Sequence, residues 1–499
     1  MKKRIIALAA AALFATAPAL AQNEGDVLRY SQTGIFGSSR SMGAGNAFGA
    51  LGADFSALVT NPAGLARYRK SEIGATVNLF NTRANTFYID NTQTDNKFNL
   101  NFNTAGLAVA IPTTNSSGWR FVNLGFGVNR LNNYNKSVIL EGVNTKSSIV
   151  HHFEQTANGH RTSDLGVTSL AYLAWYQYLI DTLPGSYDQY YSDFTNDSVF
   201  SLRQRNLIDQ SGGMNDISIS AAGNYDDKLY IGGSLNIYKV KFREDNTFIE
   251  DVLNNSVNAY KTLTLQSNLS TSGTGLGAKL GFIALPTSSI RFGVAYHTPA
   301  RIFLTDKYST VLSSTINKTS NSVSTPDGTY DYSVTIPGRV AVSGAYIIGK
   351  NGFVSADYEY IDYRNAKLTA GNQQSSVFDT FTLGVNSNIR KMYKGASNIR
   401  VGAEYLFNGV YTVRAGMGLI GSPYSEQAGT SNFKTQIPYL SAGFGIRNGN
   451  YFLDMALVRN YGTSYYAPYT LNPGGKPKYY TSETQTIATN FTISMGFKF

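Results

Sequence analysis

The chain has 499 residues, a formal net charge of +10 at pH 7 and no cysteine. The absence of cysteine excludes disulfides and thiolate metal sites, and a charge this modest for the length does not indicate a nucleic-acid-binding protein. The composition includes 34 tyrosines, 28 phenylalanines and 48 glycines, and the two aromatic residue types favour strands and membrane interfaces.

Residues 1–21 predict a secretory signal peptide. Residues 2–4 are basic, residues 5–14 are apolar, and residues 19–21 (Ala-Leu-Ala) form a small-x-small cleavage site. We therefore expect an exported protein whose mature chain begins at Gln22; an uncleaved signal anchor is the alternative, which the short apolar run disfavours. Beyond this segment no apolar run approaches the roughly 18–20 residues that a membrane helix needs.

Residues 22–68 predict a compact plug, or hatch, for the lumen of a barrel. This segment is too rich in glycine and alanine for a strand and too interrupted by glycine for one long helix. Gly43 and Gly45 allow tight bends and a close backbone approach. Asn61-Pro62, followed by Ala63, marks a turn, because proline fixes its own φ and disfavours the helical region for the residue before it.

Residues 69–499 predict a barrel with long extracellular loops, beginning with strand-like alternation near Ile73. In the last strand Phe491 and Ile493 fall on one face and Thr492 falls on the other. This period of two is typical of strands. One strand alone cannot distinguish a soluble sandwich, whose apolar face points inward, from a membrane barrel, whose apolar face points to lipid.

The connections favour the membrane barrel, because short turns alternate with long polar excursions. The predicted strands lie near residues 71–82, 98–111, 119–134, 215–224, 229–243, 273–284, 289–304, 331–347, 352–365, 397–407, 410–420, 437–447, 450–460 and 487–499. The long excursions are expected at residues 83–97, 135–214, 244–272, 305–330, 366–396, 421–436 and 461–486. We thus predict an all-β fold, a 14-stranded antiparallel transmembrane β-barrel with the N-terminal hatch in its lumen and both chain ends on the periplasmic, short-turn side.

The longest excursion contains one predicted helix, which Ser163-Asp164 can cap and Leu183-Pro184-Gly185 stops. An exposed apolar patch usually marks a contact, so its apolar residues form either a hydrophobic landing groove at the barrel mouth or the packed face of a lid helix. These candidate groove residues are Leu170, Leu173, Trp175, Tyr176, Leu179 and Ile180. A second helix is expected within Phe378–Lys394.

The stretch Ser41–Tyr68, with its GxGxAF…DFSALxxNPAGLA pattern, resembles the N-terminal hatch of the FadL/TodX family of outer-membrane channels for long-chain fatty acids and other hydrophobic compounds. Ile290–Ile302 and Ile336–Leu368 extend the resemblance over nearly the whole mature chain. In that family an inward kink of the third strand makes a side opening in the wall. The resemblance implies this role for Gly125 and Gly127; close packing of these glycines against the hatch is the alternative.

No constellation of residues predicts catalysis, and we expect no enzyme activity, no catalytic residue, no cofactor and no metal site. His151, His152 and His160 share one loop, but adjacent histidines without helical i,i+4 spacing are a poor template for metal binding. A GxSxG motif is absent, and nothing marks a Ser-His-Asp triad.

The charged residues within predicted strands include Arg291, Arg339, Arg400, Glu404 and Arg414. A charge that faces lipid is costly, so we expect these side chains to point inward or to lie near a rim. There an arginine would pair with a substrate carboxylate or, as the favoured interpretation, form an internal salt bridge that braces the barrel or holds the hatch.

Together these features predict a passive outer-membrane channel for hydrophobic compounds, with long-chain fatty acids as the leading substrate class and the hatch as the gate. Expected partners are hydrophobic small molecules, outer-membrane lipids and, because the chain ends on a strand with Phe499, the barrel-assembly machinery during biogenesis; nucleic acid is not expected. The alternatives are a structural or secretion-associated barrel that binds a protein partner through its long loops, and a water-filled porin, with which a plug conflicts.

Overall fold

The computed structural model describes residues 23–499, except 115–117, 195–200, 255–259, 317, 372–375, 427, 429–435, 472–477 and 480. The predicted signal peptide, residues 1–21, lies outside the described residues. Within them, no helix is both long and apolar enough to cross a bilayer.

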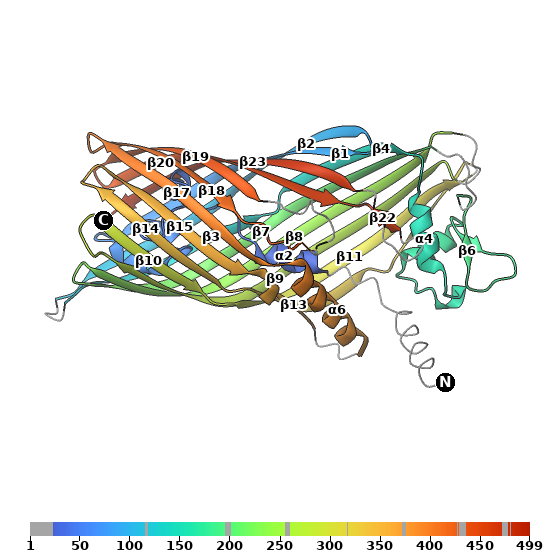
Figure 1. The fold of residues 1–499 in the computed structure, drawn as a ribbon, viewed down its shortest axis with the longest axis horizontal. Coiled ribbons are helices and arrows are strands. Elements are labelled where there is room, and N and C mark those ends of the chain that lie inside the picture. Colours follow the sequence, from blue (N-terminus) through green and yellow to red (C-terminus); the bar gives the residue numbers. More distant parts are fainter. Residues whose placement is uncertain are drawn as a thin grey trace.

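Fourteen antiparallel strands, four of them built from two segments or extended by a short one, close into a long barrel (Figure 1). In order they are β1 (Glu72–Tyr88), β2 (Asn91–Pro112), β3 (Trp119–Asn133) with β4 (Lys136–Asn144), β7 (Leu202–Tyr225), β8 (Leu229–Val252), β9 (Thr262–Ala284), β10 (Ile290–His297) with β11 (Ala300–Ile316), β13 (Gly328–Ile336) with β14 (Arg339–Ile348), β15 (Gly352–Asp362) with β16 (Lys367–Ala370), β17 (Gly395–Phe407), β18 (Tyr411–Ile420), β19 (Ile437–Asn448), β20 (Tyr451–Tyr466) and β23 (Ser482–Lys498). β23 pairs with β1 from Glu72↔Lys498 to Phe87↔Glu483, which closes the wall. The predicted 14-stranded antiparallel barrel is confirmed.

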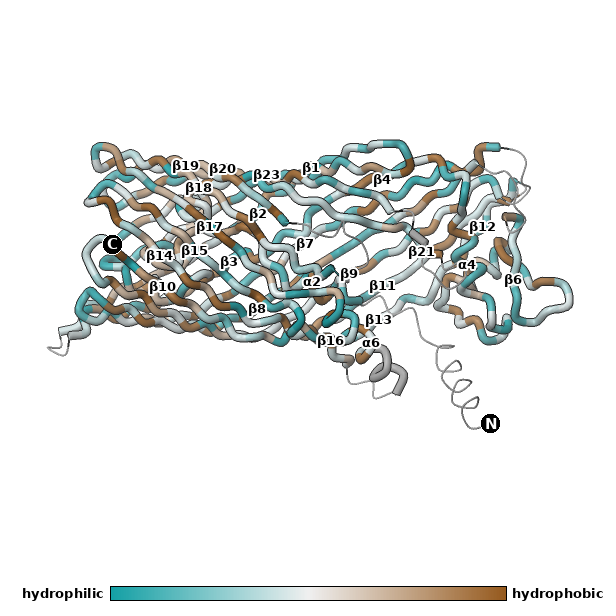
Figure 2. The backbone as a smooth tube through the Cα atoms, viewed as in Figure 1, coloured by the Kyte–Doolittle hydropathy of each residue, from teal (hydrophilic) through white to brown (hydrophobic). Residues whose placement is uncertain are grey.

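The wall carries its apolar side chains outward. On β8, Leu229, Ile231, Leu235 and Ile237 are 37–69% exposed, whereas the alternating residues such as Asn236 are buried inside. Hydrophobic residues gather over the half of the barrel that holds the short turns and the C-terminus, and the opposite half is more hydrophilic (Figure 2). This arrangement is that of a membrane barrel, with an apolar belt against lipid and a polar lumen.

Three predicted excursions are strands instead of loops, and the expectation of long loops at 83–97, 244–272 and 305–330 is corrected. β1 and β2 continue through 83–97 to a tight turn at Ile89-Asp90, and β8, β9, β11 and β13 extend into the other two ranges, where the short strand β12 (Thr319–Ser324) pairs with β11. These extensions lie beyond the apolar belt, where the outer face of a strand meets water and the inner face is buried under the cap. The hydropathy alternation therefore disappears although the hydrogen-bond ladder continues.

The N-terminal segment lies within the barrel (Figure 1). It comprises two α-helices, α2 (Glu24–Ser31) and α3 (Ser39–Gly43), and two 3-10 helices, η1 (Phe55–Leu58) and η2 (Pro62–Arg67). Met42, Ala63 and Ala66 are fully buried. We call residues 23–68 the hatch below.

The outer mouth of the barrel carries a cap built from residues 145–194. Its helices are α4 (Ile149–Ala157), η3 (Thr162–Asp164) and α5 (Leu170–Tyr176), and its short hairpin pairs β5 (Asp181–Thr182) with β6 (Tyr190–Tyr191). The sequence predicted one helix beginning at Ser163-Asp164; instead α5 begins after its N-cap Ser169 and ends before Tyr178, which has a φ of +57°. The prediction missed α4.

Three further elements complete the fold. The short hairpin of β21 (Thr470–Leu471) and β22 (Lys478–Tyr479) follows β20, and η4 (Tyr363–Asn365) joins β15 to β16. Helix α6 (Ser376–Met392) confirms the expected second helix and packs beside β16.

Candidate functional site: the hatch, the lumen and a seam in the wall

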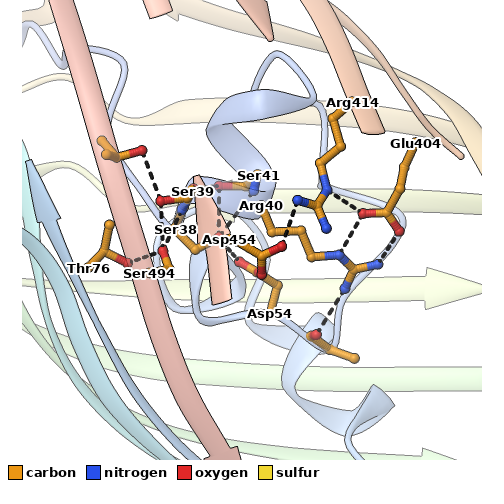
Figure 3. Close-up of polar contacts among 12 residues, drawn as sticks. Ser38, Ser39, Arg40, Ser41, Asp54, Thr76, Glu404, Arg414, Asp454 and Ser494 are labelled. Atoms are coloured by element: carbon orange, nitrogen blue, oxygen red, sulfur yellow. Dashed lines mark hydrogen bonds and ion pairs between the residues drawn. The ribbon is translucent and has the colours of Figure 1, made fainter. Parts of the chain in front are cut away.

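The hatch is held to the wall by a buried network of ion pairs (Figure 3). Arg40 of α3 donates from Nε and Nη2 to the two carboxylate oxygens of Glu404 on β17, both at 2.9 Å. Glu404 also accepts from Arg414 Nε at 2.6 Å, and Arg414 Nη1 lies 2.7 Å from Asp454 Oδ1. Two cations and two carboxylates thus balance one another where water is scarce, the condition under which buried charges are tolerated.

Hydroxyl groups fix the same helix from the opposite side. Ser39 donates its backbone N–H to Ser494 Oγ at 2.7 Å, and its own hydroxyl donates to Thr492 Oγ1 at 2.9 Å. Ser38 caps α3 and donates to Asp54 Oδ1 at 2.6 Å (Figure 3). The hatch is therefore bound tightly, although its sequence is rich in glycine.

Gly43 and Gly45 lie where the hatch backbone touches the wall. Ser441 Oγ on β19 donates to Gly43 O and accepts from Gly45 N, both at 3.1 Å. A Cβ atom on Gly45 would lie 2.5 Å from Val401 O, and the φ of Gly45 is +65°. Glycine is required here because a side chain would clash with the wall and strain the backbone.

The Asn61-Pro62-Ala63 turn starts η2 and contacts β9. The Asn61 carboxamide accepts from Ala63 N at 3.1 Å and donates to Gly49 O at 2.7 Å and, across to the wall, to Phe282 O at 3.3 Å. Pro62 occupies the first turn of η2, where its missing N–H costs nothing. Asn61 therefore joins two parts of the hatch to each other and to the barrel.

Gly125 and Gly127 on β3 face the hatch. A Cβ atom on Gly127 would lie 2.5 Å from Leu58 Cδ1, and one on Gly125 would lie 2.9 Å from Leu65 Cδ2. Both glycines sit in strand ladders that are continuous with β2 and β7. They serve the close packing of the hatch, and the wall is closed at their level, so the expected side opening at these two residues is corrected.

The hydrogen-bond ladder of the wall instead breaks higher on the same strand. Pairing of β2 with β3 ends at Thr104↔Asn129, β3 has a register shift against β7 between Arg130 and Asn132, and β4 pairs with β7 alone. No backbone ladder joins residues 91–103 of β2 to β4; side chains such as Ser137, which donates to Asp95, bridge the gap. We call this break the seam.

An inner cavity of about 70 Å³ lies between the hatch and the wall. Leu131, Met214, Tyr238 and Ile336 give it apolar surface, and Arg130 enters it from β3. Five further charged residues line it: Lys279, Arg339, Asp357, Glu359 and Arg400. Two of these cations form ion pairs with Glu359, whose carboxylate lies 3.0 Å from the Arg400 guanidinium and 4.0 Å from that of Arg339.

A second cavity, the vestibule, lies on the outer side of the hatch and has about 290 Å³. Amide and hydroxyl side chains, among them Asn135 of the seam and Asn490, share its lining with apolar residues such as Phe80 and Ile437. Thr33, Gly34 and Phe36 line both cavities and Ile35 lines the vestibule, so residues 33–36 lie between the two spaces. This partition is anchored by Gly34 N, which donates to Leu131 O at 2.8 Å, and by Arg339 Nη1, which donates to Thr33 Oγ1 at 2.8 Å.

The predicted groove residues lie in the cap and are largely packed. Leu173, Leu179 and Ile180 are at most 7% exposed and join α4 and the strand extensions in one hydrophobic cluster, against which Leu170 and Trp175 pack. Of the six, Tyr176 alone is exposed, at 58%. They form the packed face of a lid and present no open groove, which corrects that expectation.

The five charged residues singled out from the sequence, Arg291, Arg339, Arg400, Glu404 and Arg414, all point inward, as predicted. Arg339, Arg400 and Arg414 form internal ion pairs, Glu404 holds the hatch, and Arg291 Nη1 donates to Leu51 O of the hatch at 3.4 Å. Among the described residues, no group of three or more His, Asp or Glu is placed to hold a metal ion. The sequence analysis did not identify Arg40 or Arg130 as functional residues. Arg40 could have been noticed, because it is a cation within a segment of small residues.

Comparison with known proteins agrees with this geometry. The model of the family described as outer membrane protein transport protein (OMPP1/FadL/TodX) matches residues 214–497, more than half of the chain. The chain belongs to this family. Its members are outer-membrane transport proteins, and the FadL/TodX-type barrel is a channel for hydrophobic compounds.

Solved structures share the fold of this FadL/TodX-family chain. A FadL homologue from Pseudomonas aeruginosa is 13% identical, with a TM-score of 0.56 over 94% of this chain and 100% of that one. The toluene transporter TodX from Pseudomonas putida is 11% identical, with a TM-score of 0.50 over 94% of this chain and 100% of that one. No curated protein matches the sequence.

The Glu404 network makes a first prediction. In Glu404→Ala two arginines lose their shared partner, and removing one member of a buried ion pair costs about 3–5 kcal/mol. We expect the amides of residues 38–58 to exchange hydrogen at least about 100-fold faster while the amides of the barrel strands keep their protection. Asp251→Ala, which removes the exposed Arg203–Asp251 pair, is the matched control. Unchanged exchange in the Glu404 variant would show that other contacts hold the hatch.

Proposed function

We propose that this protein takes up long-chain fatty acids, or hydrophobic acids of similar shape, across the outer membrane without an energy source of its own. The observation that carries the proposal is the inner cavity, which combines apolar surface with one guanidinium that has no acidic partner. Arg130 Nε has no hydrogen-bond partner, and among the described residues no carboxylate lies within 4.0 Å of the Arg130 side-chain nitrogens. A carboxylate head group would supply that partner.

The hatch is the proposed gate. A cavity of about 70 Å³ holds only a few water molecules, so a long acyl chain cannot enter until the hatch moves. Residues 33–36 separate this cavity from the larger vestibule and are the part whose displacement would join the two. Asn61, which bonds to Phe282 O of β9, is proposed to hold the closed arrangement.

The seam is the proposed exit. Arg130 and Leu131 line the inner cavity and Asn132, Asn133 and Asn135 line the vestibule, so both spaces adjoin the same break in the wall. Phe98, Leu100 and Phe102 of β2 stand beside the break and are 63–70% exposed on the outer face. A hydrophobic solute that leaves through the seam would reach lipid without crossing water.

Uptake of a labelled long-chain fatty acid by cells that lack their own transporter tests the function directly. We expect uptake with this protein and none without it, and no uptake of a labelled sugar of similar mass, because the closed cavities exclude free diffusion. Sugar uptake would instead indicate a porin. If neither compound enters and the barrel is folded, a partner protein at the cap becomes the better explanation.

Arg130 tests the head-group preference. A hydrogen bond to a charged group contributes about 1.5–3 kcal/mol, so Arg130→Gln should weaken binding of the fatty acid about 10–100-fold and leave binding of the alkane of equal length unchanged. Arg130→Lys should restore part of the affinity, because it keeps the charge. Equal losses for the acid and the alkane would mean that Arg130 shapes the cavity and does not bind the carboxylate. Binding to purified protein by calorimetry is the measurement.

A reversible cross-link tests the exit. The protein has no native cysteine, so Asp95→Cys with Ser137→Cys would place one disulfide across the seam. We expect oxidation to abolish fatty-acid uptake and reduction to restore it. Arg83→Cys with Asn96→Cys, at paired outward positions of β1 and β2, is the matched control in an unbroken ladder. Full uptake by the oxidised seam variant would rule out this route.

A further inference from the structure

The outer surface of β8, β9 and β11 changes from apolar to basic at one level. On β8 the outward positions run from Leu235 and Ile237 directly to Lys239, Lys241 and Arg243. Across the next strands the ladder aligns Lys239 with Thr274 and Phe303, and Lys241 with Ser272 and Thr305. The apolar belt therefore ends in a sharply defined row, with hydroxyl-bearing and cationic side chains immediately beyond it.

These residues enclose a groove of about 720 Å³ on the outside of the barrel. Lys239 and Lys241 form one side and Arg301 of β11 forms the other. Arg301 is held in place, since its Nε donates to Ser333 Oγ at 2.9 Å and its guanidinium lies 5.1 Å from the Phe303 ring centroid.

The charge of the groove is not neutralised by its own acidic residue. Its charged lining residues are Lys239, Lys241, Arg301 and the single carboxylate of Asp331, which accepts a hydrogen bond from Thr305 Oγ1 at 2.5 Å. The lining therefore carries a positive excess. Three donors of positive charge at the edge of an apolar surface match a ligand with an anionic head and acyl chains.

Some cations elsewhere on the extended wall are paired. Arg203 contacts Asp251 at 2.7 Å, and Lys97 contacts Asp209 at 2.6 Å. By contrast, among the described residues no carboxylate lies within 4.0 Å of the side-chain nitrogens of Lys239, Lys241 or Arg301. The groove therefore holds three cations that are free to bind an anionic ligand.

We propose that this groove binds the phosphate of a glycolipid in the outer leaflet of the membrane. The short turns lie at the periplasmic end in bacterial barrels, and the groove lies at the opposite edge of the apolar belt, at the level of the outer head groups. Phosphate in the groove accepts hydrogen bonds from the two lysines and Arg301. The acyl chains lie against Leu276 and Leu280, which are 70% and 61% exposed just below. The site is on the outer face of the wall and does not depend on what passes through the lumen.

The test compares two probes on the full-length barrel purified in detergent: bisphosphorylated lipid A and the same lipid after phosphatase treatment. A basic side chain near a lipid head group contributes about 1 kcal/mol, so Lys239→Gln with Lys241→Gln should weaken binding of the phosphorylated lipid about 30-fold. Binding of the dephosphorylated lipid should be weak and equal in both proteins. Native mass spectrometry gives the bound fraction.

Lys228→Gln with Lys350→Gln removes two exposed lysines at the short-turn end and is the matched control, expected to bind as the unchanged protein does. All variants change outward side chains only, and resistance of the barrel to SDS at room temperature verifies folding. Arg301→Gln should weaken binding of the phosphorylated lipid by itself.

Three results would overturn the proposal. They are equal binding of the two lipids, equal loss in the control variant, and displacement of the lipid by inorganic phosphate at equal concentration, which would show a site for free anion with no contribution from the acyl chains. Fatty-acid uptake is not the readout, so failure of this site and failure of the proposed transport remain distinguishable.

Discussion

The structure depends on one constraint: in hydrocarbon every backbone N–H and C=O must find its partner within the protein. The pairing of β23 with β1 along sixteen register positions satisfies this by leaving the sheet without an edge. Closure then fixes which face of each strand meets lipid, and the alternation of Ile237 outside with Asn236 inside follows from it. A closed wall also creates a lumen, and the lumen has to be filled or left to water.

The filling of the lumen explains the charges. Inward faces rich in Asn, Ser, Thr and Arg cannot be packed by an apolar plug, because unpaired buried polar groups cost free energy. The hatch forms hydrogen bonds to them with its own polar groups. Arg40 donates to Glu404, Ser39 N donates to Ser494, and backbone carbonyls of the hatch accept from Ser441 and Asn123. Small residues such as Gly45 bring the hatch backbone near enough for these bonds, so the composition of the hatch and the polarity of the wall depend on each other.

The sequence predicted the architecture because both of its signals are local. Alternation located each membrane-spanning segment, and turns such as Asn408-Gly409, with φ values of +50° and +70°, marked the strand connections. Strand ends could not be predicted, because the extensions of β8 and β9 have polar residues on both faces and resemble loops. The residues of the candidate site were harder to predict than the strand ends. The partners of Arg40 and Arg130 lie hundreds of residues away or are lacking, and a seam is a missing pairing between strands that leaves no pattern in either one.

Energetics indicate which part of the hatch can move most readily. Displacing α3 would separate Arg40 from Glu404, at a cost of about 3–5 kcal/mol for one buried ion pair alone, and would break the serine contacts as well. The partition of residues 33–36 is held mainly by single hydrogen bonds, from Gly34 N to Leu131 O and from Arg339 to Thr33, each contributing about 1–3 kcal/mol. Gly37, with a φ of +153°, lies at its end and tolerates a change of backbone direction.

Motion of the partition alone would join the two cavities. Because Leu131 accepts one of the hydrogen bonds that hold the partition, the same motion would loosen the wall beside the seam. In the proposed route, entry into the lumen and exit into lipid would therefore be coupled through one strand, β3.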